Sequence, residues 1–130
     1  MALDLAGAAA LAAGYTAAWN SGSAAAVAAF YAEDGCIVIN RGKPWAGRVG
    51  VQAMAEGFFA DVPDLSLICD GFRLLGDHMI YLWTFTGHHA GSKAPLRIAG
   101  AEEWDLVQGR VAASRGWYDG ADYARQVAGG

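Results

Sequence analysis

The second half of this chain carries four long apolar segments that alternate with the period of β-strands and are separated by very short turns. These segments cover residues 65–75, 78–90, 95–107 and 110–118. Turn-forming residues rich in Gly, Asp and Ser lie between them, at 76–77, 91–92 and 108–109. Connections this short join neighbouring antiparallel strands, so the pattern predicts a four-stranded meander.

The first residues have helical spacing instead. Leu11, Tyr15 and Trp19 lie four residues apart, which places them on one face of a helix. Asp4 is a competent N-cap for this helix, and Asn20-Ser21-Gly22 is expected to end it.

Two further helices and one strand are predicted before the meander. A second helix is expected to start at Ser23 and to carry Val27, Phe30 and Tyr31, with Asp34-Gly35 breaking it. The other two predicted elements are a strand over 36–39 and a helix over 49–60. Helices followed by a run of strands predict an α+β fold, with about three helices on one face of a curved sheet.

Composition fits one domain over residues 1–130 and excludes some function classes. The chain has 28 Ala, 18 Gly and 15 aromatic residues, so its core must combine a few large rings with many small side chains. Nine basic residues form no basic patch and the net charge is −4, which argues against a nucleic-acid partner.

The sequence also bears on the membrane and on the compartment. No stretch reaches the ~18 apolar residues of a membrane span, and the Ala-rich start lacks the basic residues of a signal peptide. Cys36 and Cys69 have no metal-ligand spacing and are expected to be buried free thiols. We therefore predict a cytoplasmic protein.

One acidic residue interrupts an otherwise apolar strand face. Strand side chains alternate between the two faces, so Glu102 shares a face with the apolar residues of 95–107, whereas Glu103 lies on the solvated face. Burial of a carboxyl group raises its pKa, which suits a general acid or base.

The preceding strand offers a possible partner. Its aromatic face, which includes Trp83 and Phe85, is expected to point inward and would place His89 opposite Glu102. The alternative is that each of these two groups is an ordinary core residue bonded to Tyr, Trp or backbone. A one-residue slip in register would reverse both assignments.

Several segments together resemble the SnoaL-like polyketide cyclases, in the superfamily of ketosteroid isomerases and nuclear transport factor 2. The resemblance implies a cone-like α+β barrel, in which a strongly curved, mostly antiparallel sheet wraps around a long N-terminal helix and leaves a deep pocket. It also implies a homodimer. The segments that carry it are residues 15–22, 30–35, 45–48, 59–65, 83–91 and 116–119.

The resemblance also implies site residues. His89 in Gly87-His88-His89-Ala90-Gly91 matches the catalytic His of these cyclases, and Glu102 stands where they have an Asp. Tyr15 matches the helix Tyr of ketosteroid isomerases, but no acid stands near Ile39 or Asn40, where their base would fall. The Asp–Arg–Asp set of epoxide hydrolases with this fold has no counterpart around Arg97.

The sequence thus predicts a small cofactor-independent enzyme that performs acid–base chemistry on a hydrophobic, cyclic small molecule. The expected catalytic residues are His89, Glu102 and Tyr15, and the expected substrate-binding residues are Trp83, Phe85, Trp104, Ser114 and Tyr118. No metal is expected, because the adjacent His88 and His89 point to opposite faces of a strand. Two alternatives are a non-catalytic binding protein for a small apolar ligand and a protein-interaction domain.

Overall fold

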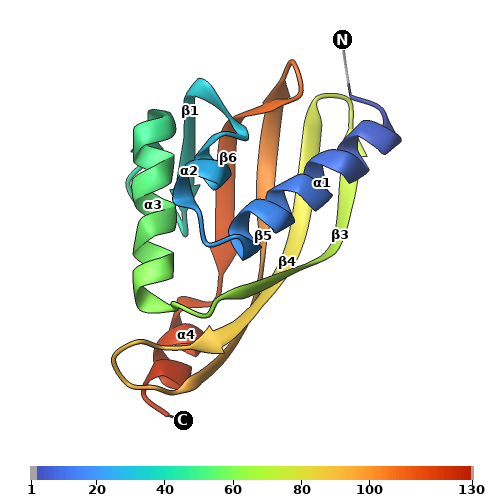
Figure 1. The fold of residues 1–130 in the computed structure, drawn as a ribbon. Helices are drawn as coiled ribbons and strands as arrows, with labels where there is room; N and C mark the ends of the chain where they lie inside the picture. The colour runs from blue at the N-terminus through green and yellow to red at the C-terminus, as the bar shows by residue number, and fades with distance from the viewer. Residues whose placement is uncertain (1–2, 130) are drawn as a thin grey trace.

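The computed structural model describes residues 3–129 of the 130-residue chain as helices packed on one curved sheet (Figure 1). The helices are α1 (Leu5–Asn20), α2 (Ala24–Ala28), α3 (Gly47–Asp61) and α4 (Gly120–Val127). The strands are β1 (Tyr31–Ile39), β2 (Trp45–Ala46), β3 (Ser66–Leu75), β4 (His78–His88), β5 (Pro95–Val107) and β6 (Arg110–Tyr118).

All six strands belong to one mixed sheet with the order β2-β1-β6-β5-β4-β3. The predicted meander is confirmed, because β3 to β6 pair with one another in antiparallel register. Strand β1 runs parallel to β6, which makes the sheet mixed. Among the described residues β2 and β3 form its two edges, so this sheet is an open cone and not a closed barrel.

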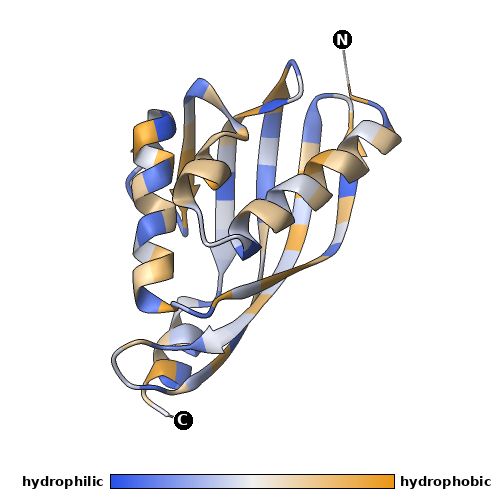
Figure 2. Cartoon of the chain, in the orientation of Figure 1, coloured by the Kyte–Doolittle hydropathy of each residue, from blue (hydrophilic) through white to orange (hydrophobic). Residues whose placement is uncertain are grey.

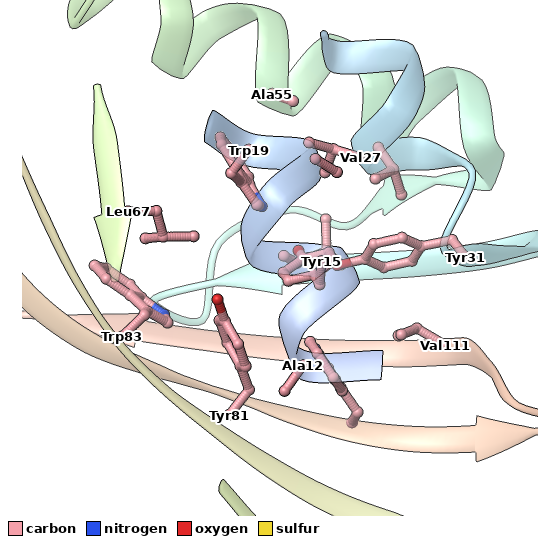
Figure 3. Close-up of a cluster of buried hydrophobic side chains, with 14 of the residues drawn as sticks. Ala12, Tyr15, Trp19, Val27, Tyr31, Ala55, Leu67, Tyr81, Trp83 and Val111 are labelled. Atoms are coloured by element: carbon pink, nitrogen blue, oxygen red, sulfur yellow. The ribbon is translucent and has the colours of Figure 1, made fainter. Parts of the chain in front are cut away.

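The concave face of the sheet is filled by α1, which crosses it in Figure 1. Tyr15 is fully buried at the centre of the cluster in Figure 3, with its ring edge-on to Tyr81 and Trp104 at centroid distances of 5.3 and 5.0 Å. Tyr81 and Trp104 are themselves stacked at 5.1 Å. The predicted α1 face is therefore the face that packs against the sheet.

Both predicted N-caps are present. The side chain of Asp4 accepts a hydrogen bond from the backbone N–H of Gly7, and that of Ser23 accepts one from Ala26. Asn20, the last residue of α1, bonds both backbone groups of Leu67 and so ties the helix to the edge strand β3.

The expected second helix is shorter than the spacing suggested. It ends at Ala28, and Tyr31 is already the first residue of β1. Between Tyr31 and Cys36 the pairing of β1 with β6 shifts register, so Glu33 and Asp34 lie exposed in an irregular part of a strand. Tertiary pairing with β6 overrides the local helical spacing in this segment.

Two elements were not expected from the sequence. The short β2 pairs with β1, and α4 follows the last strand and packs against β5. Asp119 accepts a hydrogen bond from the backbone N–H of Asp122, so this residue caps α4.

The predicted alternation of buried and exposed residues in the long strands is confirmed and is visible as colour alternation in Figure 2. In β5 the even-numbered side chains are mostly buried and the odd-numbered ones mostly solvated. Cys36 and Cys69 are free thiols, partly and not fully buried. Among residues 3–129 no helix is long and apolar enough to cross a membrane.

Candidate active site

Glu102 lies on the inner face of β5, 7% exposed, and its carboxyl group is surrounded by hydrogen-bond donors. Trp104 donates its indole N–H to Oε1 at 2.9 Å, and Ser114 of β6 donates its hydroxyl to the same oxygen at 2.8 Å. The hydroxyl of Tyr15 lies 3.1 Å from Oε1 and 3.0 Å from Oε2. Tyr31 completes the set at 3.2 Å from Oε1 and 3.1 Å from the Tyr15 hydroxyl.

The two carboxyl oxygens of Glu102 differ in their surroundings. An indole N–H can only donate, so Oε1 must be an acceptor toward Trp104 in either protonation state. Oε2 has Tyr15 as its one hydrogen-bond partner among the described residues. When the carboxyl is neutral, its proton therefore belongs on Oε2, which can donate to Tyr15 or to a bound molecule.

Burial controls the pKa of this group. Loss of solvation raises the pKa of Glu102 above its ordinary value, and the four neutral donors only partly oppose this effect. Burial and the adjacent Glu102 likewise hold the pKa values of Tyr15 and Tyr31 well above 10. Within residues 3–129 no cation forms an ion pair with Glu102, so the neutral acid is favoured over a wider pH range than for a solvated Glu.

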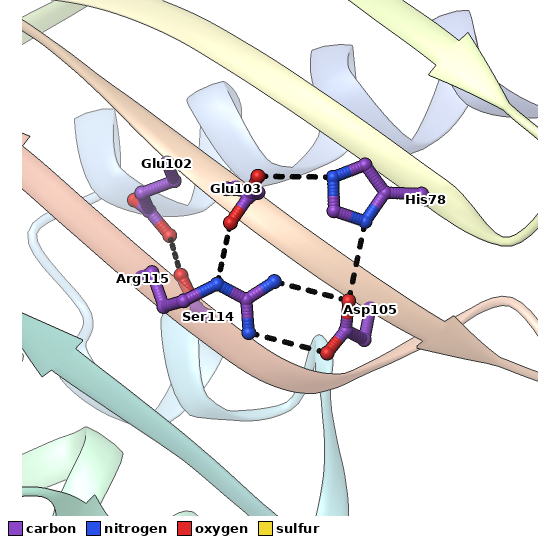
Figure 4. Close-up of polar contacts among 6 residues, drawn as sticks. All are labelled: His78, Glu102, Glu103, Asp105, Ser114 and Arg115. Carbon is purple, nitrogen blue, oxygen red and sulfur yellow. Dashed lines mark hydrogen bonds and ion pairs between the residues drawn. The ribbon is translucent and has the colours of Figure 1, made fainter.

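The next residue along β5 has a contrasting environment, as Figure 4 shows. Glu103 lies on the outer face of the sheet, where it pairs with Arg115 at 2.5 Å and with His78 at 3.1 Å. Arg115 also forms two hydrogen bonds with Asp105, and these donors lower the pKa values of both Glu103 and Asp105. The predicted difference between Glu102 and Glu103 is confirmed.

Glu102 lines a narrow apolar pocket with a volume of about 50 Å³, here called the inner pocket. A second pocket of about 270 Å³, the outer pocket, is lined by Trp45, Asp61 and Tyr123 among others. Four side chains border both, so the two pockets are adjacent. These shared residues are Ile39, Met54, Phe58 and Tyr118. The remaining side chains of the inner pocket include Trp19, Ile37, Leu65, Leu67, Trp83 and Phe85.

The expected apposition of His89 and Glu102 is wrong. The register of β4 against β5 pairs Glu102 with Tyr81, eight residues before His89, which is about 26 Å along a strand. His89 lies in the turn after β4, where its Nδ1 accepts a hydrogen bond from the backbone N–H of Ser92, and it borders neither pocket. The alternation was correct, but alternation does not fix how far along the hairpin two residues meet.

The other predicted residues fall into two groups. Trp83, Phe85 and Tyr118 line the inner pocket, as expected. Tyr15, Trp104 and Ser114 lie behind Glu102 and hold its carboxyl group. The structure therefore corrects the expected role of Trp104 as a pocket wall, because its ring faces Tyr15 and Tyr81.

Sequence reasoning missed Tyr31 as a site residue. The helical spacing of Val27, Phe30 and Tyr31 suggested a helix face, whereas Tyr31 begins β1 and reaches Glu102 from the far side of Tyr15. A Tyr at the junction of a helix and a strand was the only local signal. No group of three or more His, Cys, Asp or Glu side chains in the described part of the chain could hold a metal ion.

The open cone around α1 is the fold of ketosteroid isomerase-like proteins. Ile39, one of the two positions near which the resemblance would place an isomerase base, is an apolar wall of both pockets. The profile of one family within this class, the SnoaL-like polyketide cyclases, matches residues 9–127. The chain belongs to that family.

Solved structures with this fold are similar over nearly their whole length. A protein from Catenulispora acidiphila with a ketosteroid isomerase-like fold, in complex with trimethylamine, has a TM-score of 0.84 at 18% identity, over 91% of this chain and 92% of that one. TsrD from Streptomyces laurentii has a TM-score of 0.84 at 22% identity, over 96% and 97% of the two chains.

A third similar structure is AclR from Streptomyces galilaeus, a proposed hydroxylase. It has a TM-score of 0.83 at 18% identity, over 97% of this chain and 98% of that one. At such identities these similarities establish the fold alone. Among curated proteins, none matches the sequence.

Proposed function

We propose that the protein is a cofactor-independent enzyme that moves a proton on a hydrophobic, cyclic small molecule, with Glu102 as the general acid and base. The observation that carries this proposal is a buried carboxyl group without a cation partner among the described residues, in the lining of an apolar pocket. Membership of the SnoaL-like family supports an enzyme of the cyclase or isomerase type.

The chemistry follows from the two carboxyl oxygens. In the ionised state, Oε2 takes a proton from a carbon next to a substrate carbonyl group. The C–H bond breaks, an O–H bond forms on Oε2, and the electron pair moves to the carbonyl oxygen as an enolate. The same proton is then returned to another position of the substrate. A raised pKa makes the carboxylate a stronger base for this step than a solvated Glu.

Tyr15 positions the reacting oxygen. Its hydroxyl contacts both carboxyl oxygens and the hydroxyl of Tyr31, so it accepts a hydrogen bond from neutral Glu102 and donates one to the ionised form. Trp104 and Ser114 hold Oε1 from the other side. Of the substrate contacts proposed from the sequence, we keep Trp83, Phe85 and Tyr118. The position of His89 does not support a direct role for it in this proton transfer.

A proton-exchange assay tests the proposal. Wild-type protein incubated in deuterated buffer with 2-tetralone or 1-indanone is expected to speed the exchange of protons next to the carbonyl group, followed by NMR. Glu102→Gln should lower that rate by about 10²–10⁴, the usual contribution of a general acid or base. Glu103→Gln is the matched control, since it makes the same change on the outer face and should retain the rate.

Equal losses in Glu102→Gln and Glu103→Gln, or full activity in Glu102→Gln, would contradict the mechanism. The second candidate is a binding protein for a small apolar ligand, favoured by the fact that Glu102 is the one acidic residue among residues 3–129 that lines the inner pocket. Native mass spectrometry discriminates the two: an unaltered ligand that co-purifies supports binding alone. The pocket beside Glu102 supports the enzyme and the binding protein over the third alternative, a protein-interaction domain without a ligand.

Two further expectations remain proposals. We propose a cytoplasmic location, supported by the two free thiols, Cys36 and Cys69. The proposed chemistry also draws only on side chains of this chain and needs no cofactor.

A further inference from the structure

Trp83 is the one buried polar side chain within residues 3–129 whose polar atom has no hydrogen-bond partner. It lies on the inner face of β4, 9% exposed, and its indole nitrogen is buried. The buried indole of Trp104 on β5, by contrast, is satisfied, since it donates to Glu102. Buried N–H groups are nearly always paired in folded proteins, so an unpaired one indicates an acceptor supplied from elsewhere.

The position of the Trp83 indole is fixed by its surroundings. Its ring stacks on Phe85 at 6.0 Å and lies 6.4 Å from the ring of Tyr118, and all three side chains line the inner pocket. On the other side Trp83 covers Gly100 of β5, where an added Cβ would meet the indole at 2.4 Å. The ring is therefore held flat between the backbone of β5 and the pocket.

Trp83 shares the inner pocket with Glu102, since both residues line it. Trp83 pairs with Gly100 across the hairpin, so Glu102, two residues further along β5, is its diagonal neighbour on the same face. Such neighbours have a separation of about 7–8 Å. The inner pocket thus has two residues with polar groups among its apolar walls, the arrangement that orients small molecules in binding sites.

We propose that the indole N–H of Trp83 donates a hydrogen bond to an acceptor oxygen of the ligand and so determines which ligands bind and how they are oriented. The inference rests on the proposed function only in that the same pocket is used. It assigns Trp83 a polar role in addition to that of an apolar wall. Trp83 is a positioning residue. It favours ligands that present a carbonyl or ether oxygen to the indole over ligands that present only C–H groups there.

Two bicyclic probes test this inference, 1-indanone and indane, which share a skeleton and differ by one carbonyl oxygen. Wild-type protein is expected to bind 1-indanone more tightly than indane, measured by titration in ¹⁵N–¹H NMR spectra. Trp83→Phe keeps an aromatic ring but removes the donor. It should weaken the binding of 1-indanone by about threefold to tenfold, the contribution of one neutral hydrogen bond, and leave the binding of indane unchanged.

Trp117→Phe is the control for loss of an indole on the other face of the sheet, because Trp117 pairs with Ala101, is 41% exposed and has Arg41 over its ring. It should change the affinities for 1-indanone and for indane by the same factor. The wild-type spectrum gives a second measurement that needs no Trp83 variant: the Trp83 indole N–H resonance, assigned through its contacts with Phe85, should move downfield with 1-indanone and not with indane.

Three outcomes overturn the inference: the same 1-indanone-to-indane ratio in wild type and Trp83→Phe, an unmoved indole resonance at saturation, or no binding of 1-indanone up to its solubility limit. These outcomes are independent of the proton-exchange assay, because they concern binding and not turnover. If Glu102→Gln abolishes proton exchange, the Trp83 inference can still fail. If the Trp83 inference holds, the proposed proton transfer can still fail.

Discussion

At the scale of single residues, the site depends on one carboxyl group that the fold removes from water without giving it a charge partner among the described residues. Four neutral donors, on Tyr15, Tyr31, Trp104 and Ser114, satisfy Glu102 instead. Neutral donors stabilise an ionised carboxylate less than a cation does, so the raised pKa persists. Glu103, one residue away, has Arg115 as a partner and a lowered pKa.

This difference predicts opposite pH effects on stability. The pKa of Glu102 is higher in the folded chain than the ~4.3 of an unfolded Glu, so above that pH the folded state holds a proton that the unfolded state has lost. The wild-type free energy of unfolding therefore falls as pH rises through this window, by at most about 1.4 kcal/mol per pH unit for one proton.

Glu102→Gln removes this dependence, because the amide does not titrate and can still accept from Trp104 and donate to Tyr15. Urea denaturation at several pH values should show its stability rising relative to wild type above about pH 4. Glu103→Gln, measured in the same experiment, should lose the stabilisation that ionised Glu103 gives to the folded state. In the wild type this stabilisation is present above the pKa of an unfolded Glu and is lost as pH falls. An unchanged difference between Glu102→Gln and wild type at all pH values would refute the raised pKa.

At the scale of elements, β5 contributes most to the site. Glu102 and Trp104 point inward from it, and Gly100 leaves room for the Trp83 indole of β4. Strand β1 adds Tyr31 through the irregular pairing at its start. Sequence alternation predicted the inward face of β5, because one buried face imposes a strict period of two. The hairpin register that separates His89 from Glu102 depends on the whole ladder and was not predictable.

Two glycines in different elements provide a matched prediction. A Cβ on Gly100 would lie 2.4 Å from both the Trp83 ring and the backbone oxygen of Trp117, whereas a Cβ on Gly57 of α3 would meet nothing within 4 Å. We expect Gly100→Ala to destabilise the protein by about 1–3 kcal/mol through overpacking. Gly57→Ala should stabilise it by about 1 kcal/mol through helix propensity. Urea denaturation of both variants measures this, and equal effects would contradict the packing described.

At the scale of the whole molecule, helices and sheet leave an open cone in which α1 fills the concave face and the inner pocket lies beside Glu102. The family match over residues 9–127 confirms the resemblance read from the sequence segments. A single domain over residues 1–130 stays a prediction. The homodimer implied by the resemblance also stays a prediction.

Sedimentation equilibrium tests the dimer, which should have twice the chain mass of 13.6 kDa. Ile68, 52% exposed, follows the buried Leu67 on β3 and therefore points away from the core. If the sheet forms the contact, Ile68→Lys should weaken the dimer. Val49→Lys, at a more exposed site on α3, should not. A single-chain mass at every concentration would exclude the dimer.

The sequence by itself determined the α+β class, the long strands and the isolation of Glu102 on an apolar face, since strand period and turn chemistry are local properties. Only the tertiary structure decided which residues meet that carboxyl group. Tyr15 from α1, Tyr31 from β1 and Ser114 from β6 converge on Glu102 because the sheet curves around the helix. The unpaired indole N–H of Trp83 is likewise a property of packing, because an unsatisfied donor exists only once every neighbouring acceptor has been placed.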